Sequence, residues 1–257
     1  MDRTSRFARL AGGISIGSSR TTAGTLSGAF IDAYDGQPVL VSNWHVFEGA
    51  PGITPILQPG VADGGSQPGD VVGKLKRYVA LRGGEPPLWK RILCTLFGWL
   101  LGDWCLASNE ANFVDAACAS FEPCNPREIA HGVYLDDGSI ILPADTHPGD
   151  NVAGCSVWKS GRTTGVTVGR VISDRATLKV WYGDRYAIFT DQIIVEGGSG
   201  PGDSGSPVFL MKGGQPSGDD ALIGLLFAGS GGLYVVCKWK HVRSMLGVEW
   251  PGKTLNK

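Results

Sequence analysis

The clearest chemical feature of the chain is a serine set among glycines. The hexapeptide Gly202-Asp203-Ser204-Gly205-Ser206-Pro207 lies between two apolar segments. A nucleophilic serine needs an exposed hydroxyl, a nearby base, and backbone N–H groups directed at the developing oxyanion. Glycines on both sides of the serine allow the tight turn that presents such N–H groups. A Gly/Ser surface loop is the plain alternative, but the complete hexapeptide and its apolar flanks favour a nucleophile.

The base for this serine must be one of four histidines, at positions 45, 131, 147 and 241. His45 ends the apolar stretch VLVSNWH, which is typical of a β-strand. A packed, hydrogen-bonded core histidine is the other interpretation of such a position. The remaining three histidines lie in polar or terminal surroundings and are expected at the surface. We therefore predict that His45 is the base.

A catalytic histidine also needs a carboxylate that orients its ring. Asp115 opens the apolar segment DAACASF, where a carboxylate is costly to bury unless it is paired. Asp103 is the rival, but it lies at the end of a predicted helix, where a solvated aspartate is ordinary. The sequence therefore favours Asp115.

The elements that must position these residues are predicted to be β-strands. Short apolar or alternating runs are separated by Gly, Asp, Asn and Pro, and helical periodicity is scarce. This spacing favours barrels or a sandwich over βαβ units. The runs cover residues 13–17, 25–33, 38–44, 70–81, 114–121, 165–172, 176–182, 186–195, 206–210, 221–229 and 232–239.

One segment is predicted to be an amphipathic helix, over residues 87–101. Its apolar residues recur at helical spacing after two prolines, and Gly102 follows the last turn. Three roles stay open for this helix: packing on the rest of the fold, docking to a protein partner or a second copy, and contact with a membrane surface. It is too short to span a bilayer.

Composition narrows the class of protein. The chain has 257 residues, of which 42 % are hydrophobic, so it can form a core and is not intrinsically disordered. Its net charge of −1 gives no sign of a nucleic-acid partner. The six cysteines match no zinc spacing, and no metal or cofactor motif is present. The N-terminus lacks the apolar region of a secretory signal, so we expect reduced thiols and a cytoplasmic location.

The order His45, Asp115, Ser204, with GDSGSP around the serine, resembles the chymotrypsin/trypsin-like serine peptidase family. The resemblance spans about residues 13–248. It implies an all-β fold of two antiparallel β-barrels with the active site between them. We expect residues 1–145 to form the lobe that carries the histidine, the aspartate and the inserted helix. Residues 146–257 would form the lobe that carries the serine, with a short C-terminal helix.

The resemblance also implies a role for each residue. Ser204 would attack the scissile carbonyl, His45 would move the proton, and Asp115 would hold the imidazole. The N–H groups of Gly202 and Ser204 would form the oxyanion hole.

A second segment, WKSGRTTGVTVG at residues 158–169, is similar to one in bacterial secreted members of the family. This similarity implies that Lys159 pairs with Asp203 and orders the site. Animal members use instead a new N-terminus freed by cleavage, and here only Gly12-Gly13-Ile14 faintly resembles such a cleavage point. We therefore predict that no obligatory cleavage is needed.

The resemblance places the specificity pocket at residues without charge. Its lining would include Gly198, Ser199, Phe227, Ala228, Gly229 and Gly232. Gly198 stands where trypsin carries an aspartate, so an apolar P1 residue is predicted. Glu196 would favour basic P1 residues if the register differed slightly.

The predicted function is therefore a serine endopeptidase acting on polypeptides. A catalytically silent binding or regulatory module on the same fold is the alternative, and an esterase is a third class. The chain departs from the family at Val46, where the family has a cysteine beside the catalytic histidine. None of the six cysteines matches a family disulfide position, which fits a reducing compartment.

Overall fold

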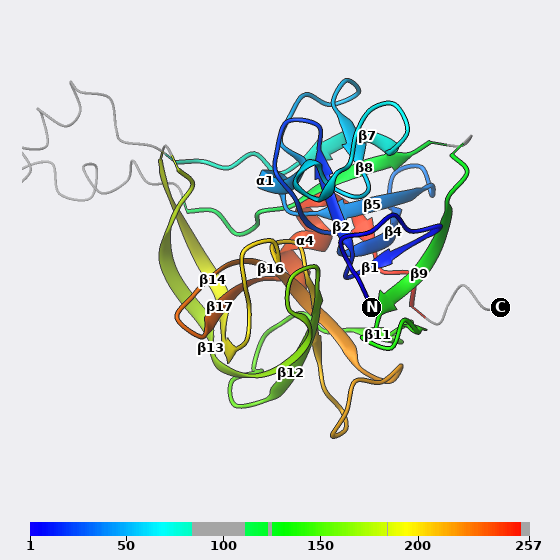
Figure 1. Ribbon diagram of the computed structural model, residues 1–257. Helices are drawn as coiled ribbons and strands as arrows, with labels where there is room; N and C mark the ends of the chain where they lie inside the picture. Colours follow the sequence, from blue (N-terminus) through cyan, green and yellow to red (C-terminus); the bar gives the residue numbers. More distant parts are fainter. Residues whose placement is uncertain (84–110, 123–124, 184, 253–257) are drawn as a thin grey trace, which may run out of the picture.

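The computed structural model describes residues 1–83, 111–122, 125–183 and 185–252 (Figure 1). Two β-sheet units make up most of these residues. The first unit carries most of its strands before residue 145, and the second is formed from the strands that follow. The helix predicted over residues 87–101 lies outside the described residues.

The first unit is built on an eight-stranded sheet with the order β18-β4-β5-β8-β7-β6-β2-β3. A three-stranded sheet, in which β9 lies between β1 and β10, packs beside it. Its strands are β1 (Arg9–Gly12), β2 (Ser15–Ser18), β3 (Gly24–Thr25), β4 (Gly28–Asp32), β5 (Pro38–Ser42), β6 (Pro55–Leu57), β7 (Val71–Tyr78), β8 (Ala117–Phe121), β9 (Glu128–Tyr134), β10 (Ile140–Ile141) and β18 (Val248–Glu249). Two short helices, α1 (Trp44–Phe47) and the 3-10 turn η1 (Val61–Asp63), belong to its loops.

The second unit is a seven-stranded sheet with the order β11-β16-β15-β12-β13-β14-β17. Strand β17 pairs with β14 and also with β16, so the sheet closes on itself as a barrel. Its elements are β11 (Asp145–Thr146), β12 (Ser156–Gly161), β13 (Gly165–Trp181), β14 (Tyr186–Gly197), β15 (Pro207–Leu210), β16 (Ala221–Ser230), β17 (Leu233–Lys238) and the helix α4 (Trp239–Leu246).

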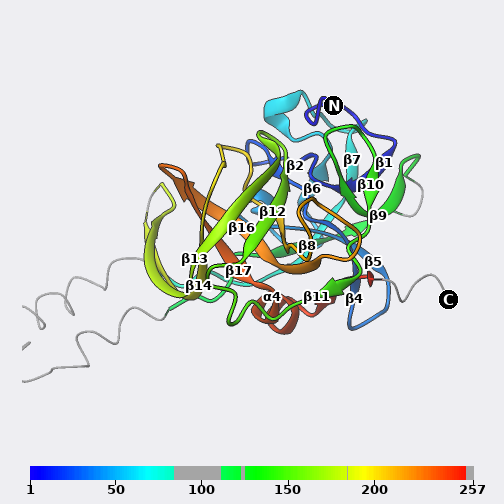
Figure 2. The same cartoon turned by 90° about the horizontal axis from the view of Figure 1, so that it is seen from below.

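The two-barrel, all-β architecture expected from the sequence is confirmed, as is the short C-terminal helix. Helix α4 buries Trp239, Val242 and Leu246 at helical spacing and ends at Gly247, whose left-handed conformation suits glycine. The chain then returns to the first unit, where β18 pairs with β4 (Figure 2). None of the helices that the structure describes has the length and apolarity that a membrane crossing requires.

One expectation about the strands is wrong. The runs at 165–172 and 176–182 were expected to be separate strands, yet β13 continues through Ser173, Asp174 and Arg175. Register irregularities in its pairing with β14 absorb these polar residues. The Asp174 carboxylate, which is nearly buried, accepts a hydrogen bond from the Val152 N–H at 2.8 Å.

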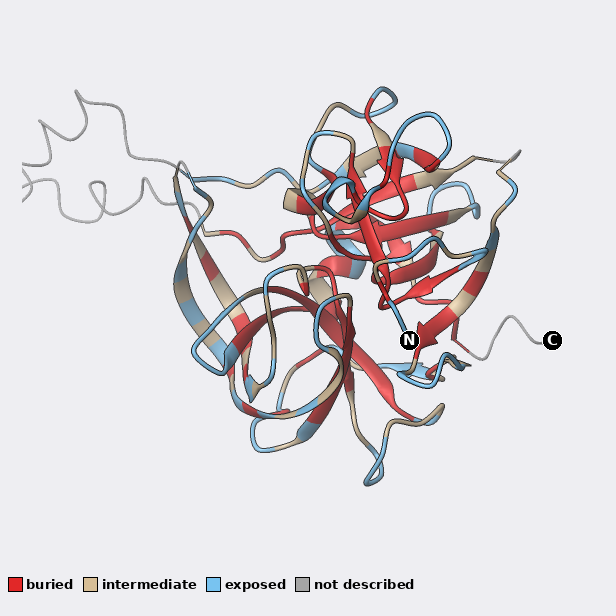
Figure 3. Ribbon diagram, in the orientation of Figure 1, coloured by how far each residue is buried: buried red, intermediate tan, exposed pale blue. Residues whose placement is uncertain are grey.

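The largest apolar core joins the two units. It contains Phe30 and Val41 of the first unit and Trp158 and Phe209 of the second. Figure 3 shows buried residues along the strands of both units. Because this core is shared, the units cannot separate without exposing it to water, which fixes the residues on either side of the interface.

Candidate active site

His45 lies in α1, a single helical turn that begins two residues after β5 ends. The apolar strand therefore stops earlier than the sequence suggests, at Ser42. Val46 and Phe47 of the same turn are buried and anchor it to the core of the first unit. The His45 side chain remains 28 % exposed. Its ring is thus held by a rigid turn while one edge stays accessible.

Asp115 faces His45 from the extended segment just before β8 and is fully buried. The His45 Nδ1 lies 2.6 Å from Asp115 Oδ2. The other carboxylate oxygen, Oδ1, accepts the backbone N–H groups of Trp44 at 2.6 Å and His45 at 3.3 Å. The Asn43 side-chain amide donates to the Asp115 carbonyl at 2.7 Å. A buried carboxylate with this many donors has a fixed orientation.

Asp115 and His45 each stabilise the charged form of the other. Burial disfavours the charged form of both groups, but their mutual attraction and hydrogen bond outweigh it. The pKa of Asp115 is therefore below its ordinary value, and the pKa of His45 is above its ordinary value. Asp115 stays ionised at neutral pH, and the Nδ1 of His45 keeps its proton as a donor.

Ser204 lies in the turn that joins β14 to β15. Gly202 and Gly205 flank it with φ values of 97° and 96°, a region that side chains with a Cβ rarely adopt. The Asp203 N–H donates to the Gly200 carbonyl at 3.0 Å, which closes the turn. Among the described residues, no acceptor is bonded to the N–H groups of Gly202 and Ser204. The turn therefore leaves two backbone donors beside the serine hydroxyl.

The first unit holds this turn in place through three hydrogen bonds. The Thr25 N–H donates to the Ser204 carbonyl at 2.7 Å, and the Thr25 hydroxyl donates to the Gly202 carbonyl at 2.8 Å. The Ser27 hydroxyl donates to the Gly205 carbonyl at 2.6 Å. These bonds fix the serine relative to the unit that carries His45 and Asp115.

A buried ion pair supports the turn from the other side. Lys159 Nζ lies 3.3 Å from Asp203 Oδ2, and neither side chain is exposed. The Asp203 carboxylate also accepts the N–H groups of Thr163, Thr164 and Gly200 and the Thr164 hydroxyl, at 2.7 to 3.1 Å. Burial lowers the pKa of Lys159 despite the attraction of Asp203. Burial raises the pKa of Asp203, but Lys159 and the hydrogen bonds more than reverse this and lower it.

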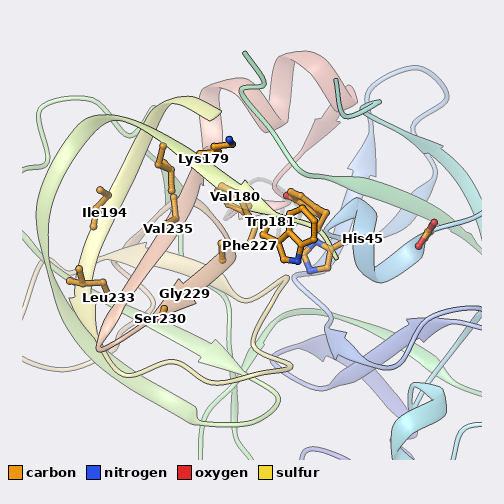
Figure 4. Close-up of a pocket in the computed structure, with 14 residues that line it drawn as sticks. His45, Lys179, Val180, Trp181, Ile194, Phe227, Gly229, Ser230, Leu233 and Val235 are labelled. Atoms are coloured by element: carbon orange, nitrogen blue, oxygen red, sulfur yellow. The ribbon is translucent and has the colours of Figure 1, made fainter. Parts of the chain in front are cut away.

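His45 and Ser204 open onto adjoining cavities. The cavity of about 380 Å³ beside Ser204 is lined by Ser199, Gly200, Pro201, Ser204, Leu226, Ala228, Gly229, Ser230 and Gly231. A groove of about 820 Å³ begins at His45 and shares Ala228, Gly229 and Ser230 with that cavity. Figure 4 shows His45 at one end of the groove and Ile194 and Leu233 at the other. No hydrogen bond joins the His45 ring to the Ser204 hydroxyl in this structure, within the described residues.

Four of the six expected pocket residues line at least one of these two cavities, and the other two line neither. Ser199, Ala228 and Gly229 line the cavity beside Ser204, and Phe227 lines the groove beside His45. Gly198 and Gly232 are in neither lining. The Gly198 carbonyl accepts the Thr167 hydroxyl at 2.9 Å, and the Gly232 carbonyl accepts the Gly197 N–H at 2.9 Å. Glu196, the residue that could have favoured basic P1 residues, is exposed and lines neither cavity.

Two contacts of Asp115 have no counterpart in the sequence analysis. The Tyr182 hydroxyl donates to Asp115 Oδ2 at 2.7 Å, and the Asp115 N–H points at Cys237 Sγ at 3.3 Å. A signal for Tyr182 exists in the sequence. Strand alternation places it on the same half-buried face as Leu178 and Val180, where a tyrosine hydroxyl needs a partner.

Asp103, the rival carboxylate, lies outside the described residues. Of the other histidines, His241 contacts Asp191 at 2.7 Å, far along the chain from the pair described above. No group of three or more metal-ligating side chains occurs among the residues that the structure describes. Cys118, Cys155 and Cys237, the described cysteines, are free thiols.

Neither a protein-family model nor a curated protein matches this sequence. Solved structures do match, each over 94 % of this chain. Thermobifida fusca protease A is 16 % identical over 97 % of its own length, with a TM-score of 0.60. A chymotrypsin of Cellulomonas bogoriensis is 16 % identical over 98 % of its length, with a TM-score of 0.58. A glutamic acid specific serine protease is 18 % identical over 100 % of its length, with a TM-score of 0.62. The chain thus has the chymotrypsin-like double β-barrel fold.

Proposed function

We propose that this protein is a serine endopeptidase that cleaves polypeptides through Ser204, His45 and Asp115. One observation carries the proposal. A fully buried carboxylate orients a histidine that lines a groove, and the adjoining cavity is lined by a serine with two backbone N–H groups that are bonded to no described acceptor. This is the set of parts that acyl transfer requires: nucleophile, base, orienting group and oxyanion donors.

The proposed reaction proceeds in two halves. His45 Nε2 takes the proton of the Ser204 hydroxyl as its oxygen attacks the scissile carbonyl, and the oxyanion is held by the N–H groups of Gly202 and Ser204. Collapse of this intermediate breaks the peptide bond, and the proton on His45 passes to the leaving amine. Water then attacks the acyl-enzyme with His45 again as base, which releases the acid product and restores Ser204. Asp115 stabilises the imidazolium in both halves and stays ionised.

We propose that Lys159 orders this site without proteolytic activation. The Lys159–Asp203 pair fixes the turn that aims the oxyanion donors. Ile14, the only residue resembling a cleavage-generated N-terminus, is fully buried, and its carbonyl accepts the Leu26 N–H at 2.9 Å. N-terminal sequencing of active enzyme should therefore find residues before Ile14. Activity confined to protein that begins at Ile14 would refute this point.

An uncharged, apolar P1 residue is the proposed specificity. The cavity beside Ser204 is lined by glycine, serine, alanine, proline and leucine, and none of these described lining residues carries a charge. Burying an unpaired charge there would be costly. The glutamic acid specific neighbour is described as using a histidine triad in substrate binding, and no histidine is among the described residues that line this cavity. A peptide library varied at P1 should show cleavage after apolar residues, whereas cleavage only after Lys, Arg or Glu would contradict the proposal.

A catalytically silent binding module remains the alternative, and one observation favours it: Ser204 and His45 are not hydrogen-bonded to each other. Such bonds often tighten only when substrate binds, so the apo geometry leaves the peptidase proposal standing. Labelling by a fluorophosphonate probe separates the two functions. The wild type should be labelled, and Ser204→Ala and His45→Ala should not. A folded wild type that resists labelling would support the silent module.

The proposal includes a polypeptide substrate, no cofactor and no nucleic-acid partner. A cytoplasmic location, and a docking, self-association or membrane-surface role for residues 87–101, stay predictions from the sequence. Deleting residues 84–110 and measuring sedimentation and vesicle binding tests the role of residues 87–101. A change in either property would support an interaction role, and no change in both would contradict it.

A further inference from the structure

Tyr182 lies where the second unit meets the Asp115–His45 pair of the first. It directly follows β13, and its N–H donates to the Arg185 carbonyl at 2.9 Å, which holds the backbone at this end of the hairpin. The ring stands edge-on to the His45 ring with centroids 5.8 Å apart, and it stacks on Phe189 of β14 at 6.2 Å. The side chain is half-buried, so these contacts restrict its rotamer.

The Tyr182 hydroxyl shares an acceptor with His45. It donates to Asp115 Oδ2 at 2.7 Å, while His45 Nδ1 lies 2.6 Å from the same oxygen. Oδ2 therefore receives one donor from each unit. Burial raises the pKa of Tyr182 far above its ordinary value, and the Asp115 charge raises it further. The hydroxyl thus keeps its proton at neutral pH and acts as a donor there.

Several groups face this arrangement. Glu48, at the end of α1, adds negative charge near His45. Cys237 of β17 faces the Asp115 N–H. The positive charge of Arg185, in the same hairpin as Tyr182, lowers the pKa of Tyr182 but does not offset the effect of burial. None of these three groups donates a hydrogen bond to Asp115 Oδ2, the oxygen that His45 contacts, whereas the Tyr182 hydroxyl does. It therefore differs from the rest in acting on Oδ2 itself.

We propose that Tyr182 is a positioning residue for the Asp115–His45 pair, whose hydroxyl fixes Asp115 Oδ2 and reduces the negative charge that His45 meets. The inference rests on the proposed peptidase function. A second donor on Oδ2 draws electron density from that oxygen and weakens its attraction for the imidazolium. His45 consequently loses its proton at a lower pH than it would if Asp115 Oδ2 had no second donor. The bond also ties the hairpin of the second unit to the base of the first.

Tyr182→Phe removes the hydroxyl and keeps the ring. We expect kcat to fall about three- to tenfold with KM little changed, the scale of one ordinary hydrogen bond. We also expect the acid limb of the pH profile of kcat/KM to move to higher pH. Tyr186→Phe is the matched control, because Tyr186 is an exposed tyrosine of the same hairpin whose hydroxyl is bonded to no described residue. It should behave as the wild type.

A direct titration of His45 by NMR tests the inference without relying on activity. In the Ser204→Ala background, Tyr182→Phe should raise the His45 midpoint, and Tyr186→Phe should leave it unchanged. If Tyr182→Phe does not fold, 3-fluorotyrosine at position 182 replaces it, since its more acidic hydroxyl donates more strongly and should lower the midpoint. An unchanged midpoint with either substitution refutes the role of Tyr182. A wild type without Ser204-dependent labelling would instead refute the peptidase proposal, so the two failures are distinguishable.

Discussion

Replacing Lys159 by methionine removes the buried charge behind the turn that carries Ser204 and keeps the length of the side chain. Lys159 Nζ contacts Asp203 Oδ2 at 3.3 Å and donates to the Thr164 hydroxyl at 2.6 Å and the Gly165 carbonyl at 3.3 Å. All these contacts are lost in Lys159→Met. The variant leaves Asp203 ionised, buried and without its counter-charge.

The structure sets the expected size of the effect. Removing one partner of a buried ion pair costs about 3 to 5 kcal/mol. Asp203 keeps four hydrogen-bond donors from Thr163, Thr164 and Gly200, and the burial cost of the Lys159 charge is recovered. Both points favour the lower end of this energy range, so we expect a loss of about 3 kcal/mol in the free energy of unfolding. Losing one oxyanion donor costs about 10² to 10³ in kcat. Because Thr25 still holds the turn, we expect a loss of about ten- to hundredfold.

The effect depends on pH with a defined sign. The pKa of Asp203 in the folded wild type lies below its ordinary value of 3.8. Its contribution to stability is therefore present above pH 3.8 and is lost as pH falls through the folded pKa. Lys159→Met removes or reverses that contribution at neutral pH only. The stability difference between wild type and variant should thus be full at pH 7 and shrink below about pH 4.

Urea unfolding of both proteins from pH 3 to pH 7, together with kcat/KM at pH 7, measures these quantities. Lys212→Met is the matched control, since Lys212 is 54 % exposed and lies 3.9 Å from an exposed Asp145 carboxylate. Its unfolding free energy should change by less than about 1 kcal/mol. A Lys159→Met variant as stable and active as Lys212→Met would refute the reasoning, as would a stability difference that does not narrow in acid.

Four further predictions concern His45, the turn at Gly202 and the pocket. Burial lowers the pKa of His45, but the attraction of Asp115 outweighs burial and raises it. The value of kcat/KM should therefore fall in acid with a midpoint above pH 6.5, and a midpoint below pH 6.5 would contradict this. The His45–Asp115 pair also stabilises the folded protein. Its full contribution is present below pH 6.5 and is lost as pH rises through the folded pKa of His45, which unfolding measurements on Ser204→Ala can follow. Gly202→Ala should cost about 1 to 3 kcal/mol and most of the activity, because φ is 97° and a Cβ would collide with Arg162; wild-type melting and kcat would contradict this. Gly229→Val should abolish cleavage after large P1 residues and spare small ones, because a Cβ at Gly229 would lie 2.7 Å from Ser199 Oγ; equal losses for all P1 residues would contradict it.

The fold was predictable because its signals are local. Alternating or apolar runs with glycine-rich punctuation identify strands such as β5, β14 and β16, and these alone favour an all-β architecture. Strand β9 was not predicted from the same signals. Its sequence EIAHGVY is interrupted by His131 and by Gly132, which has a φ of 113°, so neither alternation nor a continuous apolar run marks it.

The elements of the site were predictable where chemistry imposes a local pattern. The glycines around Ser204 follow from the turn that its N–H groups require, and the structure places a left-handed glycine on each side. The contacts that hold the turn carry no such pattern. Thr25 and Ser27 are 177 and 178 residues away in sequence from the carbonyls they bind, and single hydroxyls of this kind occur throughout the chain.

Tyr182 shows the same limit from another side. Alternation in ATLKVWY places it on a half-buried face, which predicts that its hydroxyl needs an acceptor. The identity of that acceptor depends on how β13 packs against the segment before β8, a contact between the two units. Pairwise contacts across the interface arise only once both units have folded, so the sequence indicates candidate residues but not the hydrogen-bond network around them.

Formation of an acyl-enzyme on Ser204 tests the central claim most directly. Protein quenched in acid during turnover of an activated ester is analysed by intact mass, and the modified peptide is then sequenced. One acyl group should accumulate on the peptide containing Ser204 in the wild type, and His45→Ala and Ser204→Ala should show none. Turnover without an adduct on Ser204, or an equal adduct in His45→Ala, would contradict the central claim.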